Sequence, residues 1–442
     1  MVVLIKIAQL LLSLSILVIL HEFGHFAFAK LFKTRVEKFY LFFNPWFSLF
    51  KRKIGETEYG IGWLPLGGYV KISGMIDESM DKEQMKKPAE PYEFRAKPSW
   101  QRLLIMLGGV MVNFVLALFI YSAILFVWGD RYLPTKNVDN GIMVDSVAKS
   151  VGFKNGDKIL SVDNEYVEDF LQIVPTIVLN EAKTVQIRRN GSKKDIKISE
   201  DVIPVLLNDP GFISVRIPFI VSAFSKDSKA KIAGLKKGDE IIGLNGMKMK
   251  FFDQFADSLK NIKADIVNIT VARDNEELSY DVKLTNSGII GVSPSGNLSD
   301  FFELEYTEYG FFAAIPAGIN KGIETFKSYL KQLKLIFSPS TGAYKSLGGF
   351  ITIGNIFPST WDWHAFWSLT AFLSIILAIM NVLPIPALDG GHVVFLLYEM
   401  ITGRKPNDKV MEYAQIAGMI ILFSLLIFAN GNDIVKWLSG KL

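Results

Sequence analysis

Four long stretches with almost no charged residues limit the folds that this chain can adopt. The first begins near Met1, contains only Lys6, and ends in His-Glu-Phe-Gly-His at residues 21–25. The other three contain no Asp, Glu, Lys or Arg and cover residues 103–128, 365–388 and 413–432. At about 1.5 Å per residue, a helix over any of these stretches can cross a bilayer core. Since lipid offers no partner to unpaired backbone groups, the sequence predicts a polytopic α-helical membrane protein with four spans.

The composition supports a membrane protein and excludes several kinds of site. Half of the 442 residues are hydrophobic, and the mean hydropathy of +0.28 is high for a soluble protein. A net charge of +4 from 48 basic and 44 acidic residues gives no reason to expect nucleic-acid binding. The chain has no cysteine, which excludes disulfides, thiolate metal sites and thiol catalysis. Any metal ion must therefore be bound by histidine and carboxylate groups.

The His-Glu-Phe-Gly-His motif has the spacing of a zinc hydrolase. On a helix, His21 and His25 lie on the same face and can point to one place, with Glu22 a short distance away. Two neutral imidazoles can then bind zinc while Glu22 takes a proton from the attacking water. The alternative is a pair of core histidines that fall four positions apart by chance. Because the chain has only 4 histidines, and because burying these groups in an apolar span is costly, the pattern favours a metal site.

A carboxylate near the end of the third apolar stretch supplies the ligand that the two histidines lack. Residues 381–392 read Asn-Val-Leu-Pro-Ile-Pro-Ala-Leu-Asp-Gly-Gly-His. Pro384 and Pro386 interrupt helical hydrogen bonding and free backbone groups inside the bilayer. Asp389 is an ionisable group at the end of an apolar span, which indicates function, and we predict that it is the third zinc ligand. His392 fits either an outer contact to the metal site or a structural role at a helix end, and the structural role is favoured.

The distribution of Lys and Arg predicts the orientation of the chain in the membrane. The loop between the first two spans is basic along its length, from Lys30 to Arg102, and the loop after the third span carries three basic residues between positions 404 and 409. Basic loops stay in the cytoplasm, so both termini and residues 129–364 are expected on the outer side. The His-Glu-Phe-Gly-His motif then lies near the cytoplasmic end of the first span.

The first basic loop contains a stretch with the pattern of short strands. Between residues 36 and 75, aromatic and β-branched residues alternate with Gly and Pro, and residues 63–73 predict a β-hairpin or a short sheet. This stretch is apolar enough to enter the membrane beside the metal, which non-helical backbone tolerates only against protein or a water-filled cavity. An ordinary cytoplasmic loop is the alternative.

Three residues of the second span are unusual for a helix in lipid. Gly108 and Gly109 lack side chains and allow another helix to approach closely. Asn113 needs a hydrogen-bond partner inside the helix bundle.

Residues 130–300 differ from the spans and contain a repeat. Five residues recur at a period of 82, where Gly152, Gly156, Asp157, Ile159 and Phe170 return as Gly234, Gly238, Asp239, Ile241 and Phe252. Both copies resemble the PDZ domain, in which a Gly-Asp turn leads into a strand, so we expect two mixed α/β modules. PDZ domains bind extended peptides at a sheet edge. Copies that serve only as spacers are the alternative, since a fold does not establish binding.

An amphipathic helix is expected between the modules and the third span. Apolar residues follow one helical stripe over residues 316–337, and lysines lie elsewhere on that helix. It can lie on the membrane face and tie the outer modules to the spans, or it can be a core helix of the second module. The expected order is an N-terminal membrane part, two PDZ-like modules, a linker and a C-terminal membrane part, with bounds 1–129, 130–212, 213–300, 301–364 and 365–442.

Taken together, these motifs resemble the site-2 protease family over essentially all 442 residues. The resemblance includes a short sequence that matches the family's membrane-inserted hairpin, made of Gly68, Tyr69, Val70 and Lys71. It implies the same three zinc ligands and the same base, and also that Asn381 and Pro384 help to hold the substrate strand. Two places depart from the family pattern. Residues 346–350 read Ser-Leu-Gly-Gly-Phe where Ser-Gly-Pro is frequent, and Val110 follows Gly109 where Pro is common, so details of gating are less transferable.

The resemblance also implies a substrate, partners and a location. The family hydrolyses a peptide bond in the transmembrane segment of a single-span protein. Here that implies an anti-sigma factor already trimmed by an upstream site-1 protease, or signal-peptide remnants. The location would be the bilayer of a bacterial cytoplasmic (inner) membrane, with the outer modules restricting entry. An exposed strand edge near residues 68–72 could pair with the unwound substrate and replace its lost hydrogen bonds.

Two other functions fit these residues less well than a protease. A catalytically silent membrane scaffold with PDZ-like modules has no reason to bury two histidines and two carboxylates. A metal-ion transporter predicts polar residues spread across the spans, whereas those of this chain cluster at one depth.

Overall fold

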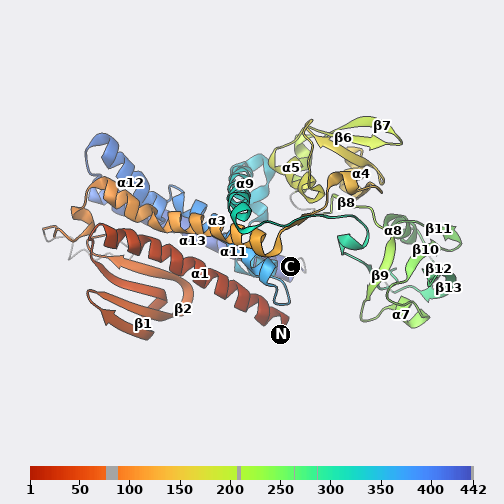
Figure 1. Cartoon of the computed structure of the whole chain (residues 1–442), viewed down its shortest axis with the longest axis horizontal. Helices are drawn as coiled ribbons and strands as arrows, with labels where there is room; N and C mark the ends of the chain where they lie inside the picture. Colours follow the sequence, from red (N-terminus) through yellow and green to blue (C-terminus); the bar gives the residue numbers. More distant parts are fainter. Residues whose placement is uncertain (76–87, 207–210, 263, 286, 440–442) are drawn as a thin grey trace. The chain divides into compact units, whose positions relative to one another are not determined.

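The computed structural model describes residues 1–75, 88–206, 211–262, 264–285 and 287–439, which form two compact units. The first unit consists of residues 1–129, 308–330 and 347–442, and the second of residues 130–307 and 331–346. The first contains long helices and one curled sheet, and the second contains smaller sheets with short helices (Figure 1). The division separates the expected spans from the expected modules.

Within the described residues, four helices are long and apolar enough to cross a membrane. They lie where the sequence predicts them and are α1 (Val2–Leu31), α3 (Ser99–Trp128), α11 (Trp363–Val382) and α13 (Asp408–Leu438). The histidine motif lies inside α1, as its spacing requires. Long apolar helices together with β-sheets are consistent with the predicted class of membrane protein.

α1 and α3 approach so closely that their backbones are in contact. A Cβ atom on Gly24 would lie 2.2 Å from the carbonyl oxygen of Gly108, and a Cβ atom on Gly108 would lie 2.6 Å from that of Gly24. Only glycine fits at such a crossing, because any side chain would push the helices apart. The close approach expected at Gly108 is therefore confirmed, and its partner is the helix that carries the histidines.

A sheet of two long strands follows α1. It is formed by β1 (Val36–Ile54) and β2 (Thr57–Ile72), which join through a tight turn at Gly55, where φ is +60°. The prediction of sheet structure in residues 63–73 is confirmed, but those residues are not a hairpin by themselves. They belong to one strand of a larger hairpin, whose turn is the Gly-Glu pair at residues 55–56.

The sheet is curled because β1 pairs with β2 twice. Tyr40, in the first half of β1, lies opposite both Gly60 and Tyr69, which belong to different halves of β2. Residues 68–72 are paired on one side, to the beginning of β1. The last part of β2 is therefore an edge of this sheet.

The chain breaks its helical course between α11 and α12 (Asp389–Thr402). α11 ends at Val382, earlier than the apolar stretch, because two prolines follow that cannot donate backbone hydrogen bonds. The turn is tight, and a Cβ atom on Gly390 would lie 2.2 Å from the carbonyl oxygen of Leu383. Asp389 thus begins a new helix rather than ending the third span.

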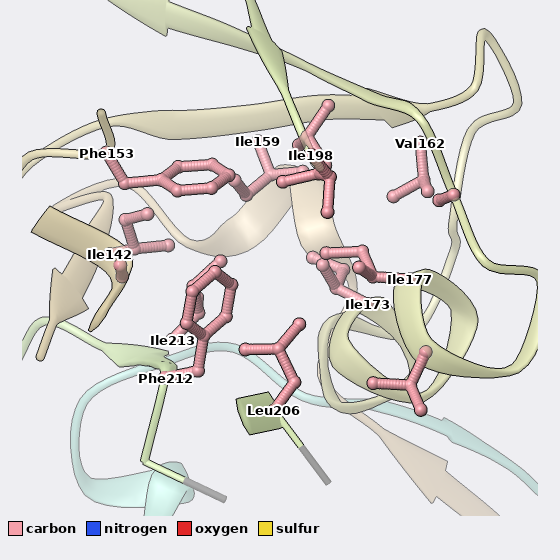
Figure 2. Packing of buried hydrophobic residues seen from close by; sticks show 14 of the residues in the cluster. Ile142, Phe153, Ile159, Val162, Ile173, Ile177, Ile198, Leu206, Phe212 and Ile213 are labelled. Atoms are coloured by element: carbon pink, nitrogen blue, oxygen red, sulfur yellow. The ribbon is translucent and has the colours of Figure 1, made fainter. Parts of the chain in front are cut away.

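The first part of the second unit folds around one hydrophobic core (Figure 2). Its strands are β4 (Ile142–Val144), β5 (Lys158–Val162), β6 (Thr184–Arg189), β7 (Ser192–Lys197) and β8 (Ile213–Val215). β5, β6 and β7 form an antiparallel sheet, and β4 pairs with β8. In Figure 2, Phe153, Phe212 and Ile177 from α5 (Ile173–Leu179) lie around the same interior. Apolar residues on one helix face and on alternate strand positions produce this core.

The second part of this unit has its own core and repeats the same three-strand succession. Its strands are β9 (Phe219–Phe224), β10 (Glu240–Leu244), β11 (Met247–Lys248), β12 (Ile266–Arg273), β13 (Glu276–Lys283) and β14 (Val292–Pro294). They are ordered β13-β12-β10-β9-β14, and β11 pairs with β10. Helix α8 (Phe252–Lys260) contributes Phe255 and Leu259 to the core. β10, β12 and β13 therefore correspond to β5, β6 and β7.

The recurring Gly-Asp pairs hold equivalent ion pairs. Asp157 accepts hydrogen bonds from the Arg189 guanidinium at 2.7 and 2.6 Å, and Asp239 accepts them from Arg273 at 2.6 and 2.7 Å. Each arginine also donates to the carbonyl oxygen of the glycine that recurs five residues before the aspartate. Both aspartates are 1% exposed. The repeat seen in the sequence thus preserves a buried charge pair just before the first strand of each recurring set of three, β5 in the first module and β10 in the second.

α9 (Phe311–Phe337) contains the expected amphipathic helix and begins earlier than residue 316. Its first part belongs to the first unit, and residues 331–346 belong to the second. In that second unit, Leu335 is 2% exposed and is buried with Ala343 in the same core as β4 to β8. Residues of the expected linker therefore complete the core around β4 to β8, rather than that of the second module.

Candidate metal centre

His21 and His25 bring two ring nitrogens together on the buried side of α1. His21 is 7% exposed and His25 is 5% exposed. Because they are four positions apart on a helix, their ring centroids are 4.9 Å apart and their Nε2 atoms 3.3 Å apart. The geometry agrees with the spacing seen in the sequence.

Asp389 adds a carboxylate oxygen to this pair from the first residue of α12. Its Oδ2 atom lies 3.2 Å from Nε2 of His21 and 3.3 Å from Nε2 of His25. In a tetrahedral zinc site with metal–ligand distances of about 2.0–2.1 Å, neighbouring ligand atoms lie roughly 3.3 Å apart. The three atoms therefore fit a single zinc ion with a fourth position for water or substrate.

α3 contacts the outer nitrogens of both rings. Nδ1 of His25 donates a hydrogen bond to the carbonyl oxygen of Ile105 at 2.8 Å, since a carbonyl oxygen can only accept. Nδ1 of His21 lies 3.2 Å from Nδ2 of Asn113. With Nδ1 engaged in this way, each ring presents Nε2 to the metal position. The partner that Asn113 was expected to need is thus one of the predicted ligands.

Gly109 leaves room for the two rings. A Cβ atom at this position would lie 2.5 Å from Nε2 of His25 and 2.6 Å from Cε1 of His21. The sequence analysis singled out Gly109 only as a residue that permits helix packing, and it overlooked both this contact and the one at Gly24. The glycine inside His-Glu-Phe-Gly-His was the available signal, because a glycine in the middle of a helix is costly unless something approaches it.

Glu22 lies against the edge of β2. A Cβ atom on Gly68 would lie 3.5 Å from Cγ of Glu22, and the backbone of Val70 lies beside the Glu22 carboxyl group. The structure therefore brings two of the predicted substrate-binding residues to the predicted base. Strand alternation turns their neighbours to the other face.

Tyr69 and Lys71 have partners within the sheet. The Tyr69 ring stacks on Tyr40 with centroids 5.3 Å apart, and its hydroxyl donates to Oδ1 of Asn44 at 3.0 Å. Nζ of Lys71 lies 3.5 Å from a carboxylate oxygen of Glu37. These two residues hold the end of β2 in its place on β1.

Asn381 lies closer to the metal centre than a substrate-binding role requires. Its Nδ2 atom is 3.2 Å from Nε2 of His21. Pro384 lies in the segment that turns the chain from α11 to Asp389. His392, one turn further along α12, lines a cavity of about 380 Å³ whose wall includes the Arg102–Glu399 ion pair.

The second unit has one further candidate site, a groove on its second module. A cavity of about 580 Å³ lies between α8 and residues 287–293, and its lining includes Phe252, Phe255 and Ala256. In the first module, Leu206 of α6 (Ile203–Leu206) is 3% exposed and fills the space beside α5. Figure 2 shows Leu206 facing Phe212 and the α5 helix. The structure thus describes a groove beside α8 in the second module, whereas Leu206 packs beside α5 in the first.

Comparison with known proteins identifies relatives along nearly the whole chain. The family model of peptidase family M50 matches residues 9–425. The "Regulator of sigma E protease" of Haemophilus influenzae is 28% identical and covers 98% of this chain and 99% of its own length. The "Regulator of sigma-E protease RseP" of Escherichia coli is 29% identical, with coverage of 97% and 98%. A "Putative zinc metalloprotease" of Borreliella burgdorferi is 30% identical and covers 96% of both chains.

Proposed function

The chain belongs to peptidase family M50, the site-2 proteases, and on that premise we propose that His21, His25 and Asp389 hold its zinc ion and that Glu22 is its general base. Membership of the family makes it a zinc metalloprotease that acts within the membrane. The observation that supports the ligand assignment is the approach of three ligand atoms to within 3.3 Å of one another. Two of them come from α1 and the third from a helix near the other end of the chain.

The chemistry assigns a separate task to each group. A zinc ion held by these residues would polarise the scissile carbonyl and lower the pKa of its bound water to about 7. Glu22 takes the proton from the attacking water and passes it to the leaving amine. His21 and His25 present Nε2 lone pairs because their Nδ1 atoms are engaged by α3. The buried position of both rings keeps bulk water away from the reacting bond.

The edge of β2 that faces away from β1 is the proposed place at which the substrate strand binds. A transmembrane helix shields its own peptide bonds, so it must unwind before hydrolysis, and its backbone groups then need new partners in lipid. Residues 68–72 are paired to β1 on one side, and a further strand can add to the other. Gly68 and Val70 lie beside Glu22, so a strand added there would lie next to the base. Asn381 and Pro384 are proposed to hold the same strand from the side of α11.

The relatives favour a regulatory protease. Those from Haemophilus influenzae and Escherichia coli are named regulators of sigma-E protease. The chain is accordingly an inner-membrane protein whose substrate is a membrane protein in the bilayer. As the specific substrate we propose a single-span anti-sigma factor that a site-1 protease has trimmed, or a signal-peptide remnant. The basic loops support a topology with both termini and the modules outside and the active site toward the cytoplasm.

The two modules of the second unit, which the sequence predicts at residues 130–212 and 213–300, are proposed to be PDZ-like filters on the outer side, with the division after β8, since residues 213–215 pair with β4. Their strand succession and the buried Asp–Arg pairs recur together, which supports a shared fold. The groove beside α8 supports peptide binding by the second module. The filled space beside α5 favours a structural role for the first.

A cleavage assay on purified protein in lipid vesicles tests this function. The substrate is a single-span protein, offered both with and without its folded outer domain, and the control enzyme carries Glu22→Gln. Zinc-dependent hydrolysis inside the transmembrane segment of the trimmed substrate, absent with the control, is the expected result. Hydrolysis that persists with the control, or in the presence of a zinc chelator, would contradict the proposal.

A further inference from the structure

Asn113 is a buried amide in α3 beside the metal centre. It is 0% exposed, and its Nδ2 atom lies 3.2 Å from Nδ1 of His21. The backbone carbonyl oxygen of Asn113 accepts a hydrogen bond from the hydroxyl of Ser374 on α11 at 2.7 Å. An amide in the apolar interior of a helix bundle is costly unless its polar atoms are paired. We therefore ask which hydrogen bond the Asn113 side chain makes beside the proposed ligand His21.

The tautomer of His21 determines what Asn113 must do. Nε2 of His21 is the atom that faces Asp389 and His25, so Nε2 is the nitrogen available to a metal. In a neutral imidazole, one nitrogen carries the hydrogen when the other offers its lone pair. Nδ1 of His21 therefore carries a hydrogen and needs an acceptor, just as Nδ1 of His25 has one in the carbonyl oxygen of Ile105.

We infer that Asn113 is a positioning residue whose Oδ1 atom accepts the hydrogen bond from Nδ1 of His21. Half a turn of the amide exchanges Oδ1 and Nδ2, which have nearly the same size. Oδ1 then lies beside the ring nitrogen. In the orientation that the structure has, Nδ2 faces Nδ1 of His21, so a ring with its hydrogen on Nδ1 would meet a second donor there, and Oδ1 has no hydrogen-bond partner among the described residues. The inference rests on the proposed function, since it assumes that His21 binds zinc.

The two amides around His21 have different tasks. Asn381 lies at Nε2, on the side of the ring that zinc would take, whereas Asn113 lies at Nδ1, where a contact can persist with the metal bound. A fixed acceptor at Nδ1 sets the orientation of the ring and raises the basicity of Nε2. Ser374 holds the α3 backbone at Asn113 and so fixes the height of the amide along the bundle.

The test compares two variants of Asn113 in the full-length protein. Leu has the same branched shape and no polar atom, so Asn113→Leu removes the acceptor. Asp offers only acceptor atoms when ionised, so Asn113→Asp keeps it. Thr370→Val is the matched control, because Thr370 is also 0% exposed and hydrogen-bonds Ser13 at 3.0 Å, with no contact to a ligand among the described residues. The readouts are the zinc dissociation constant, from competition with a chelator, and the visible spectrum of the Co²⁺-loaded protein.

The expected result separates an acceptor from a packing residue. Asn113→Leu should weaken zinc binding by about 10- to 100-fold and change the Co²⁺ spectrum, as loss of an outer partner does. Asn113→Asp and Thr370→Val should bind zinc with nearly the wild-type affinity. Wild-type affinity in Asn113→Leu would overturn the inference, and so would an equal loss in Asn113→Asp.

A further comparison separates this inference from the proposed function. If the wild-type protein binds no zinc, the proposed function itself fails. If the wild type binds zinc and Asn113→Leu binds it equally well, only the role of Asn113 fails. Should Asn113→Leu not fold, Asn113→Asp against Thr370→Val decides the matter, since a pure packing role predicts that the buried charge of Asp weakens binding.

Discussion

Nε2 of His21 lies 3.2 Å from Oδ2 of Asp389, although the two residues come from opposite ends of the chain. Two features of the fold make this contact possible. α1 and α3 meet through Gly24 and Gly108 without intervening side chains, and the chain breaks after α11 so that Asp389 begins α12. The candidate metal centre thus depends on backbone geometry as much as on its ligands.

Glu22→Gln is expected to abolish cleavage and to leave the zinc content unchanged. The amide has nearly the same shape as the carboxyl group but cannot take a proton, and Glu22 is not among the proposed ligands. Loss of a general base lowers the rate by about 10²- to 10⁴-fold. Cleavage and zinc content are measured on the same preparation. Activity near wild type would contradict the role of Glu22, and loss of zinc would make it a ligand instead.

Gly109→Ala is expected to disturb the metal centre although it replaces none of the proposed ligands. The new methyl group would lie 2.5 Å from Nε2 of His25, so the ring or the helix has to move. Such overpacking costs about 1–3 kcal/mol, and we expect weaker zinc binding together with reduced activity. Gly431→Ala on α13 is the control, because its Cβ atom meets nothing within 4 Å. Equal zinc affinity in both variants would contradict the close contact between Gly109 and the two rings.

Asp239→Asn is expected to destabilise the second module at neutral pH. Removing the carboxylate charge leaves the guanidinium of Arg273 without its ion-pair partner, so the free energy of unfolding of this module should fall. Urea unfolding of the full-length protein, followed in β10 and β12 by hydrogen exchange, measures the effect. Asp274→Asn, in the exposed turn between β12 and β13, is the control and should change little.

The same pair predicts how this stability depends on pH. Burial raises the pKa of Asp239, but the hydrogen bonds from Arg273 and from the backbone of Lys236, together with the charges of both residues, outweigh burial and hold the pKa of that carboxyl group below its usual value. A group whose pKa is lower in the folded state stabilises the fold above its unfolded pKa, here about 3.9, and loses that contribution as the pH falls through the folded pKa. The difference between wild type and Asp239→Asn should therefore shrink below about pH 4. A constant difference down to acid pH would contradict the charge pair.

Removing the second module is expected to relax selectivity and to preserve hydrolysis. β9 and β14 pair at Val221 and Pro294, so the ends of residues 219–294 lie side by side and a short Gly-Ser linker can join them. A larger deletion of residues 130–300 would expose Leu335, which is buried with the first module. The shortened enzyme should cleave a trimmed substrate as the wild type does, and should discriminate less against an untrimmed one.

The deletion tests whether the second module is the filter, and a variant of the groove tests whether the groove binds peptide. If full selectivity persists after this deletion, the second module is not the filter. In the intact protein, a peptide that binds in the groove should protect the groove from hydrogen exchange. Ala256→Trp fills the groove and should remove that protection. Unchanged protection by the peptide in Ala256→Trp would contradict a role for the groove.

Much of the metal centre could be predicted because its signals are local. The spacing of His21 and His25 requires only a helix, and Asp389 stands out as a charge beside an apolar stretch. The contributions of Ile105 and Gly109 could not be predicted, since they depend on which helix lies next to α1. No local pattern specifies a backbone carbonyl as the partner of a ring.

The same contrast applies to the sheets and the modules. The Gly-Asp repeat identified Asp157 and Asp239 in the sequence. It did not identify their arginine partners, because these lie at different distances along the chain in the two copies. The strand character of β2 was visible, whereas its partner begins at Val36 and the turn at Gly55 was missed. Leu335 is buried in the core of the first module, although the sequence predicted a linker at its position. Contacts between distant segments are what the sequence alone does not reveal.

The zinc content of the purified protein tests the central claim most directly. Metal analysis is carried out on the wild type and on His21→Ala and Asp389→Ala, purified in parallel and matched for folded protein. The account predicts one zinc ion per wild-type chain and a marked loss in both variants, since each lacks one of three protein ligands. A wild-type chain without zinc, or zinc bound as tightly by Asp389→Ala as by the wild type, would contradict the account.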